Sequence, residues 1–136
     1  MSSLQIDDYF EAVALYRLLL SYKYAPNPLH REIFGSPFVA AFHKRLAYWL
    51  SEIESQRGNP TAAAGWTPAI EPDSRVWNLL IDNTVAMSVG NGWVILSAET
   101  KRTVAANILT PFVYDEATLG LFVQQLDTRL PHADEK

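Results

Sequence analysis

Residues 75–109 constrain the fold of this chain more than any other stretch. They contain four short apolar runs separated by connectors of about two residues. Connectors of this length typically join neighbouring antiparallel strands, and Gly, Asn and Asp tolerate the positive φ angles that such turns need. The pattern therefore predicts a four-stranded antiparallel meander. Its predicted strands are residues 76–81, 84–89, 92–98 and 102–109, and its connectors are Asp82-Asn83, Gly90-Asn91 and Thr100-Lys101.

Both faces of this predicted sheet are apolar. Alternation along the strands places Val76 and Leu80 on one face, and Trp77 and Trp93 on the other. A sheet that is apolar on both sides must be covered on both sides, or must leave one side for a partner. We therefore expect helices against both faces, or an exposed aromatic surface that includes the two tryptophans.

A helix over residues 76–87 is the alternative interpretation of the first two runs. Asp73 would cap it, and Val76, Leu79, Leu80 and Asn83 match a helical period in part. A hairpin around residues 90–92 is expected under both interpretations.

Two helices are predicted before this stretch. The first covers residues 6–22, with either Ser2 or Ser3 as its cap and three acids near its start, where the helix dipole favours negative charge. The second covers residues 37–56, with Ser36 as its cap and Gly58 as its C-terminal stop. The apolar stripe of this second helix consists of Phe38, Phe42, Leu46 (or Arg45), Trp49 and Ile53.

A final helix is predicted over residues 116–130. Asp115 is its cap, and Pro131 ends it. Its one-sided stripe consists of Leu119, Phe122, Val123, Leu126 and Leu130. Residues 58–74 read as a long loop rich in Ala, Gly and Pro. The predicted fold is therefore α+β, with two N-terminal helices, a four-stranded antiparallel meander sheet and a C-terminal helix. It forms a single domain over residues 1–131, followed by a tail of residues 132–136.

The composition restricts the class of protein. The chain has 136 residues, a net charge of −4 and no Cys, which excludes disulfides and thiolate metal sites. The charge argues against nucleic acid and anionic membrane as partners. The N-terminus is acidic where a secretory signal would be basic, so we expect a cytoplasmic protein.

No catalytic or metal motif stands out. The three histidines, His30, His43 and His132, have no partner at metal-ligand spacing, and we expect neither a metal nor a cofactor. Gly90-Asn91-Gly92 reads as a hairpin turn, since a phosphate-binding loop would be followed by a helix. These observations favour a protein that is not an enzyme.

Clustered acids and spare tryptophans point to protein binding. If the first two helices are antiparallel, the acids that begin the first lie near those that end the second and form one negative patch. An aromatic residue such as Trp66 or Trp77 would then anchor a cationic partner. We therefore predict a small protein-binding module that masks a basic protein, as immunity proteins and inhibitors do. The predicted partner-binding residues are Asp7, Asp8, Glu11, Glu52, Glu54, Trp66, Glu71, Asp73 and Trp77.

Two alternatives remain open. One is a small-molecule binder or enzyme with a pocket between helices and sheet, lined by Trp77, Trp93 and His30. The other is a structural homodimer joined through the less covered face of the sheet.

Overall fold

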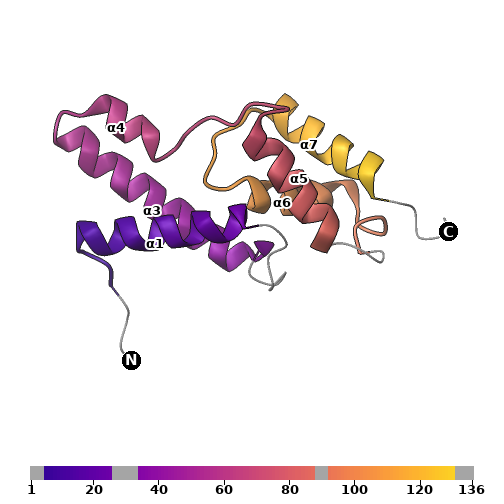
Figure 1. Cartoon of the computed structure of the whole chain (residues 1–136), viewed down its shortest axis with the longest axis horizontal. Coiled ribbons are helices and arrows are strands. Elements are labelled where there is room, and N and C mark those ends of the chain that lie inside the picture. The colour runs from indigo at the N-terminus through magenta and orange to yellow at the C-terminus, as the bar shows by residue number, and fades with distance from the viewer. Residues whose placement is uncertain (1–4, 26–33, 88–91, 131–136) are drawn as a thin grey trace.

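The computed structural model describes residues 5–25, 34–87 and 92–130, and these form six helices and no strand. In Figure 1, the first three helices lie on one side of the molecule and the last three on the other. The helices are α1 (Tyr9–Tyr24), α3 (Pro37–Gln56), α4 (Pro60–Gly65), α5 (Arg75–Met87), α6 (Ala98–Leu109) and α7 (Glu116–Arg129).

The predicted α+β fold with its meander is wrong, because helices occupy most of the stretch assigned to strands. Helix α5 replaces the first predicted strand and most of the second, in agreement with the alternative interpretation. Helix α6 covers the stretch of the last predicted strand, and residues 92–95 form a turn. The Gly90-Asn91 connector lies outside the described residues, but the predicted hairpin is wrong, because residues 84–87 belong to α5 and residues 92–95 form a turn.

The apparent turn at Asp82-Asn83 lies inside α5 because Asn83 has partners that the sequence does not reveal. Its side-chain amide is buried and donates to the carbonyl oxygens of Lys23 and Ala25, both at 3.0 Å. A buried amide with two acceptors is satisfied without a turn. The helix is capped by Ser74, whose hydroxyl accepts from the Trp77 amide at 3.2 Å, and Asp73 precedes it with a φ of 61°.

The helices outside this stretch agree better with the sequence. Helix α3 has the predicted bounds and its Ser36 cap, and Gly58 follows it with a φ of 78°. Helix α7 begins after the predicted Asp115 cap. Helix α1 starts three residues later than predicted and is capped by Asp8. The predicted loop contains α4, which begins at Pro60.

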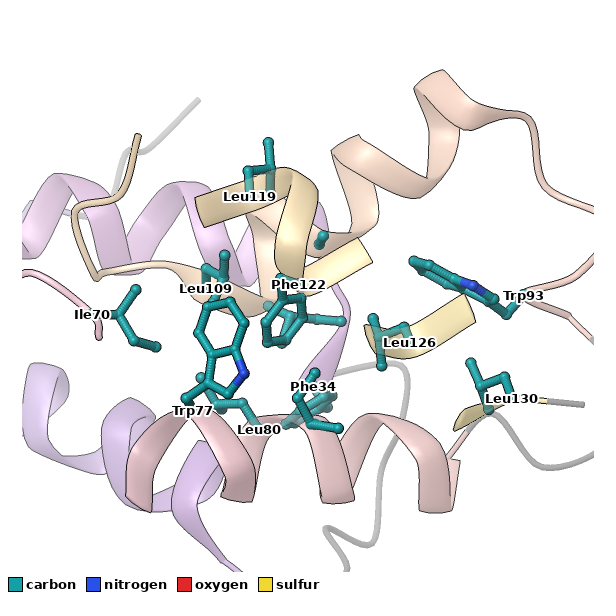
Figure 2. Packing of buried hydrophobic residues seen from close by; sticks show 13 residues of the cluster. Phe34, Ile70, Trp77, Leu80, Trp93, Leu109, Leu119, Phe122, Leu126 and Leu130 are labelled. Atoms are coloured by element: carbon teal, nitrogen blue, oxygen red, sulfur yellow. The ribbon is translucent and has the colours of Figure 1, made fainter. Parts of the chain in front are cut away.

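One hydrophobic core lies among α5, α6 and α7. Trp77 of α5 is fully buried against Phe122 of α7, with ring centroids 4.9 Å apart in an edge-to-face arrangement (Figure 2). The Trp77 indole N–H donates to the Gln125 side-chain oxygen at 2.7 Å, so its polar atom is satisfied as well. Leu109 and Leu126 belong to the same cluster as these rings (Figure 2). Such an aromatic pair contributes about 0.5–1.5 kcal/mol beyond the area that it buries.

A second cluster joins α1 to α3, and polar contacts connect it to the first core. The buried Lys23 ammonium of α1 donates to the Asn107 carbonyl at 3.0 Å, the Ile108 carbonyl at 2.6 Å and the Thr110 carbonyl, all at the C-terminal end of α6. A cation is favourable at that end of a helix. Burial lowers the pKa of Lys23 to about 7, while the three carbonyl acceptors favour its charged form.

Candidate binding site

Helices α1 and α3 form an antiparallel pair, so the start of α1 lies beside the end of α3 (Figure 1). The Tyr9 hydroxyl at the start of α1 donates to a Glu54 carboxylate oxygen at 2.6 Å. Small residues, Ala12 on α1 and Ala47 on α3, are completely buried within the pair. Tyr16 lies in the same cluster, and its hydroxyl donates to the Trp66 carbonyl at 3.0 Å.

The predicted apolar stripe of α3 coincides only in part with the face that α3 turns to the core. The buried face consists of Ala40, His43, Leu46, Ala47, Leu50 and Glu54, and only Leu46 of these belongs to the stripe. Phe38 is 83 % exposed, and Phe42 and Trp49 are half-buried. On α1, Phe10 is likewise 78 % exposed. The helix pair therefore leaves large apolar side chains accessible.

Part of this stripe forms a hollow. A groove of about 480 Å³ lies between α3 and the segment that precedes α1, and we call it the α1–α3 groove. It is lined by Ile6, Phe42, Arg45, Leu46 and Trp49. Its lining is mainly apolar and aromatic, with one cation, which suits an amphipathic protein segment.

Exposed acids lie beside this groove. Asp7 and Asp8 directly follow the groove residue Ile6, and Glu11 lies in the first turn of α1. Glu52 is exposed on α3, one turn beyond Trp49. Asp8 also caps α1, because its carboxylate accepts from the amides of Phe10 at 2.8 Å and Glu11 at 3.1 Å.

Glu54 belongs to the packing of the helix pair. It is buried and accepts hydrogen bonds from Tyr9 and from the Asn59 side chain, the latter at 3.2 Å. The Arg57 guanidinium lies 3.9 Å from a carboxylate oxygen of Glu54. The hydrogen bond from Tyr9 lowers the pKa of Glu54 and, in return, raises the pKa of Tyr9. These partners account for an acid near a helix C-terminus, where the dipole disfavours it.

The remaining predicted partner-binding residues lie elsewhere. Glu71 and Asp73 are exposed before the start of α5, away from the start of α1 (Figure 1). Trp66 is half-buried, with its ring 4.9 Å from that of Tyr16. Trp77 is fully buried and therefore cannot touch a partner. Of the predicted residues, Asp7, Asp8 and Glu11 thus lie at the start of α1 and Glu52 near the end of α3, while the others lie elsewhere or are buried.

The two tryptophans assigned to the predicted pocket are core residues. Trp77 and Trp93 are both buried in the first core, and the Trp93 indole N–H donates to Asp127 at 2.7 Å. His30 and His132 lie outside the described residues. His43 is completely buried, with its ring 4.8 Å from that of Tyr16, and neither ring nitrogen has a hydrogen-bond partner among the described residues. Burial, aided by the charge of Lys23, lowers the pKa of His43 to about 4.

The sequence did carry a signal for the groove. Ala40 and Ala47 lie at helical spacing with Leu50, and small residues permit close helix contacts, so a second face of α3 was available for packing. Packing through that face leaves Phe38 exposed and Phe42 and Trp49 half-buried.

Within residues 5–25, 34–87 and 92–130, no group of three or more His, Asp or Glu side chains is arranged to hold a metal ion. Across the same ranges, no helix has the length and apolar character needed to cross a membrane. No protein-family model, curated protein or solved structure matches this chain.

Proposed function

We propose that this protein is a small binding module that masks a basic protein, and that it holds an apolar, positively charged segment of its partner in the α1–α3 groove. The observation that supports this proposal is the combination of an apolar groove of about 480 Å³ with exposed acids next to it. Apolar contacts in the groove would supply affinity, and the acids would attract and orient the partner.

The charges around the groove would orient a basic partner segment. Asp7, Glu11 and Glu52 form no ion pair with any other residue in the described part of the chain. They are therefore free to meet cations of a partner. Arg45 lines the groove itself and would repel such cations. A basic segment would place its charges towards the acids and its apolar side chains against Phe42 and Trp49.

Capture of partners from a lysate of the source cells tests this proposal. The wild-type protein should retain a basic protein in low salt and release it as salt rises, because the attraction between surface charges is screened. Asp7→Asn combined with Glu52→Gln should weaken retention, and Arg45→Glu should strengthen it. All three positions are exposed, so these variants should fold normally.

Glu99→Gln is the matched control. Glu99 is an exposed acid at the start of α6, in the other group of helices, and its neutralisation should leave retention unchanged. Recovery of no basic protein, or retention that all variants share equally, would count against the proposed function.

A further inference from the structure

A second hollow surface lies on another side of α3, facing the end of α6 and the segment that follows it. It consists of two adjoining hollows of about 250 and 240 Å³. Both are lined by Lys44, Thr110 and Tyr114, so the Lys44 side chain belongs to each of them. Lys44 and Arg45 are neighbours in sequence, but Lys44 lines these two hollows whereas Arg45 lines the α1–α3 groove.

Lys44 is a cation without a compensating acid in the described part of the chain. Four other cations, Arg57, Lys101, Arg102 and Arg129, pair with carboxylates. The ammonium of Lys44 instead lies 5.8 Å from the centroid of the Tyr48 ring, and no carboxylate of the described residues pairs with it.

Two tyrosine hydroxyl groups line the first hollow together with Lys44, those of Tyr48 and Tyr114. Thr110 lines it as well, but its hydroxyl donates to the Ala106 carbonyl at 3.0 Å. Burial raises the pKa of Tyr114, with Glu116 and Tyr48 acting in the same direction, so its hydroxyl keeps its proton and can donate. An ammonium together with neutral hydroxyl donors is a suitable set of partners for a carboxylate.

The rest of the first hollow is apolar. Residues 111–113, which are Pro, Phe and Val, form one wall, and Ala47 lies on the α3 side. Ala40 lines the second hollow, and His43 lies between the two alanines on the same face of α3. This arrangement offers an apolar body a place next to the charged group.

We propose that this surface binds a small organic carboxylate, with its charged group at Lys44 and its apolar body against Tyr48 and residues 111–113. The ligand is either a free acid or the C-terminal carboxylate of a peptide, which share this chemistry. The hollow is smaller than a typical drug-sized pocket, so the ligand is small and the dissociation constant is on the order of 1 mM.

Titrations followed by amide chemical shifts test the site with four probes. Phenylacetate and N-acetylglycylphenylalanine carry the carboxylate, and their amides are the neutral analogues. At least one acid should shift the backbone amide signals of Lys44, Thr110 and Tyr114 in a saturable manner. The neutral amide analogue of that acid should not shift them. Binding of phenylacetate alone identifies a free acid as the ligand class, and binding of the peptide acid alone identifies a chain terminus.

Lys44→Met should weaken acid binding at least about tenfold, the effect expected from loss of a charge-assisted hydrogen bond. Arg75→Met, which removes an exposed cation at the start of α5, should leave it unchanged. The proposal is overturned if neither acid binds saturably at 20 mM, if the neutral amides bind equally well, or if both variants lose binding alike.

Discussion

Replacement of His43 by Leu should remove a large part of the acid sensitivity of this protein. The pKa of His43 falls from the usual 6.5 to about 4 in the folded chain, because the imidazole is buried and lies near the charge of Lys23, and no described residue bonds to its nitrogens. Between these values the unfolded chain binds a proton that the folded chain does not. Stability is therefore lost as the pH falls below about 6.5, and the loss is complete below about 4.

The magnitude follows from the two pKa values. Each tenfold difference in proton affinity corresponds to about 1.4 kcal/mol, so the complete loss is roughly 3 kcal/mol. Between pH 7 and pH 4.5 the expected loss from this one side chain is about 2 kcal/mol. At pH 7 the variant should also be as stable as the wild type or more so, because two buried nitrogens without partners disfavour folding.

Urea unfolding of both proteins at pH 7 and pH 4.5, followed by far-UV circular dichroism at constant ionic strength, measures these free energies. Other titrating groups such as Glu54 and Asp115 are common to both proteins, so they largely cancel in the comparison. An equal loss of stability on acidification in both proteins would refute the reasoning. A clear destabilisation of the variant at pH 7 would show that the imidazole has a favourable partner.

Three further substitutions test the packing by the same unfolding assay. Trp77→Ala should destabilise the protein by about 3–5 kcal/mol, since it opens a cavity beside Phe122; a loss below about 1 kcal/mol would contradict the burial of this ring. Phe38→Ser should change stability by less than about 0.5 kcal/mol because the ring is exposed, and a larger loss would place it in the core. Asp115→Ala should remove about 1 kcal/mol with the α7 cap, whereas Asp115→Asn should retain most of it.

The helices that could be predicted have strong boundary signals. Ser36 followed by Pro37 starts α3, and Asp115 starts α7 before a one-sided apolar stripe. These signals are local, since a capping side chain bonds to amides within its own first turn. They consequently remain valid whatever the rest of the chain packs against.

Residues 75–109 were mispredicted because their local signals are ambiguous. Short apolar runs separated by polar pairs satisfy the period of a strand and, in part, that of a helix. The Asn83 side chain bonds to the end of α1, about sixty residues earlier in the chain, and these bonds favour the helix over a turn. Contacts over such separations cannot be read from a local pattern.

The surroundings of the predicted site residues depend on similar long-range contacts. That the start of α1 lies near the end of α3 followed from an antiparallel pair. The role of Glu54 depends on Tyr9 and Asn59, and the burial of Trp77 depends on α7. The orientation of α3 also depends on its neighbours, because two of its faces could serve as the core.

Binding of a cationic amphipathic helix to the α1–α3 groove is the most direct test of the proposed function. The probe is a peptide of Leu and Lys at helical spacing, and its matched control carries Glu in place of Lys. In an amide chemical-shift titration, the Lys peptide should produce saturable shifts at Ile6, Phe42 and Trp49 that weaken as salt rises. Equal binding of the Glu peptide, or shifts that avoid the groove, would contradict a surface built to hold a basic partner.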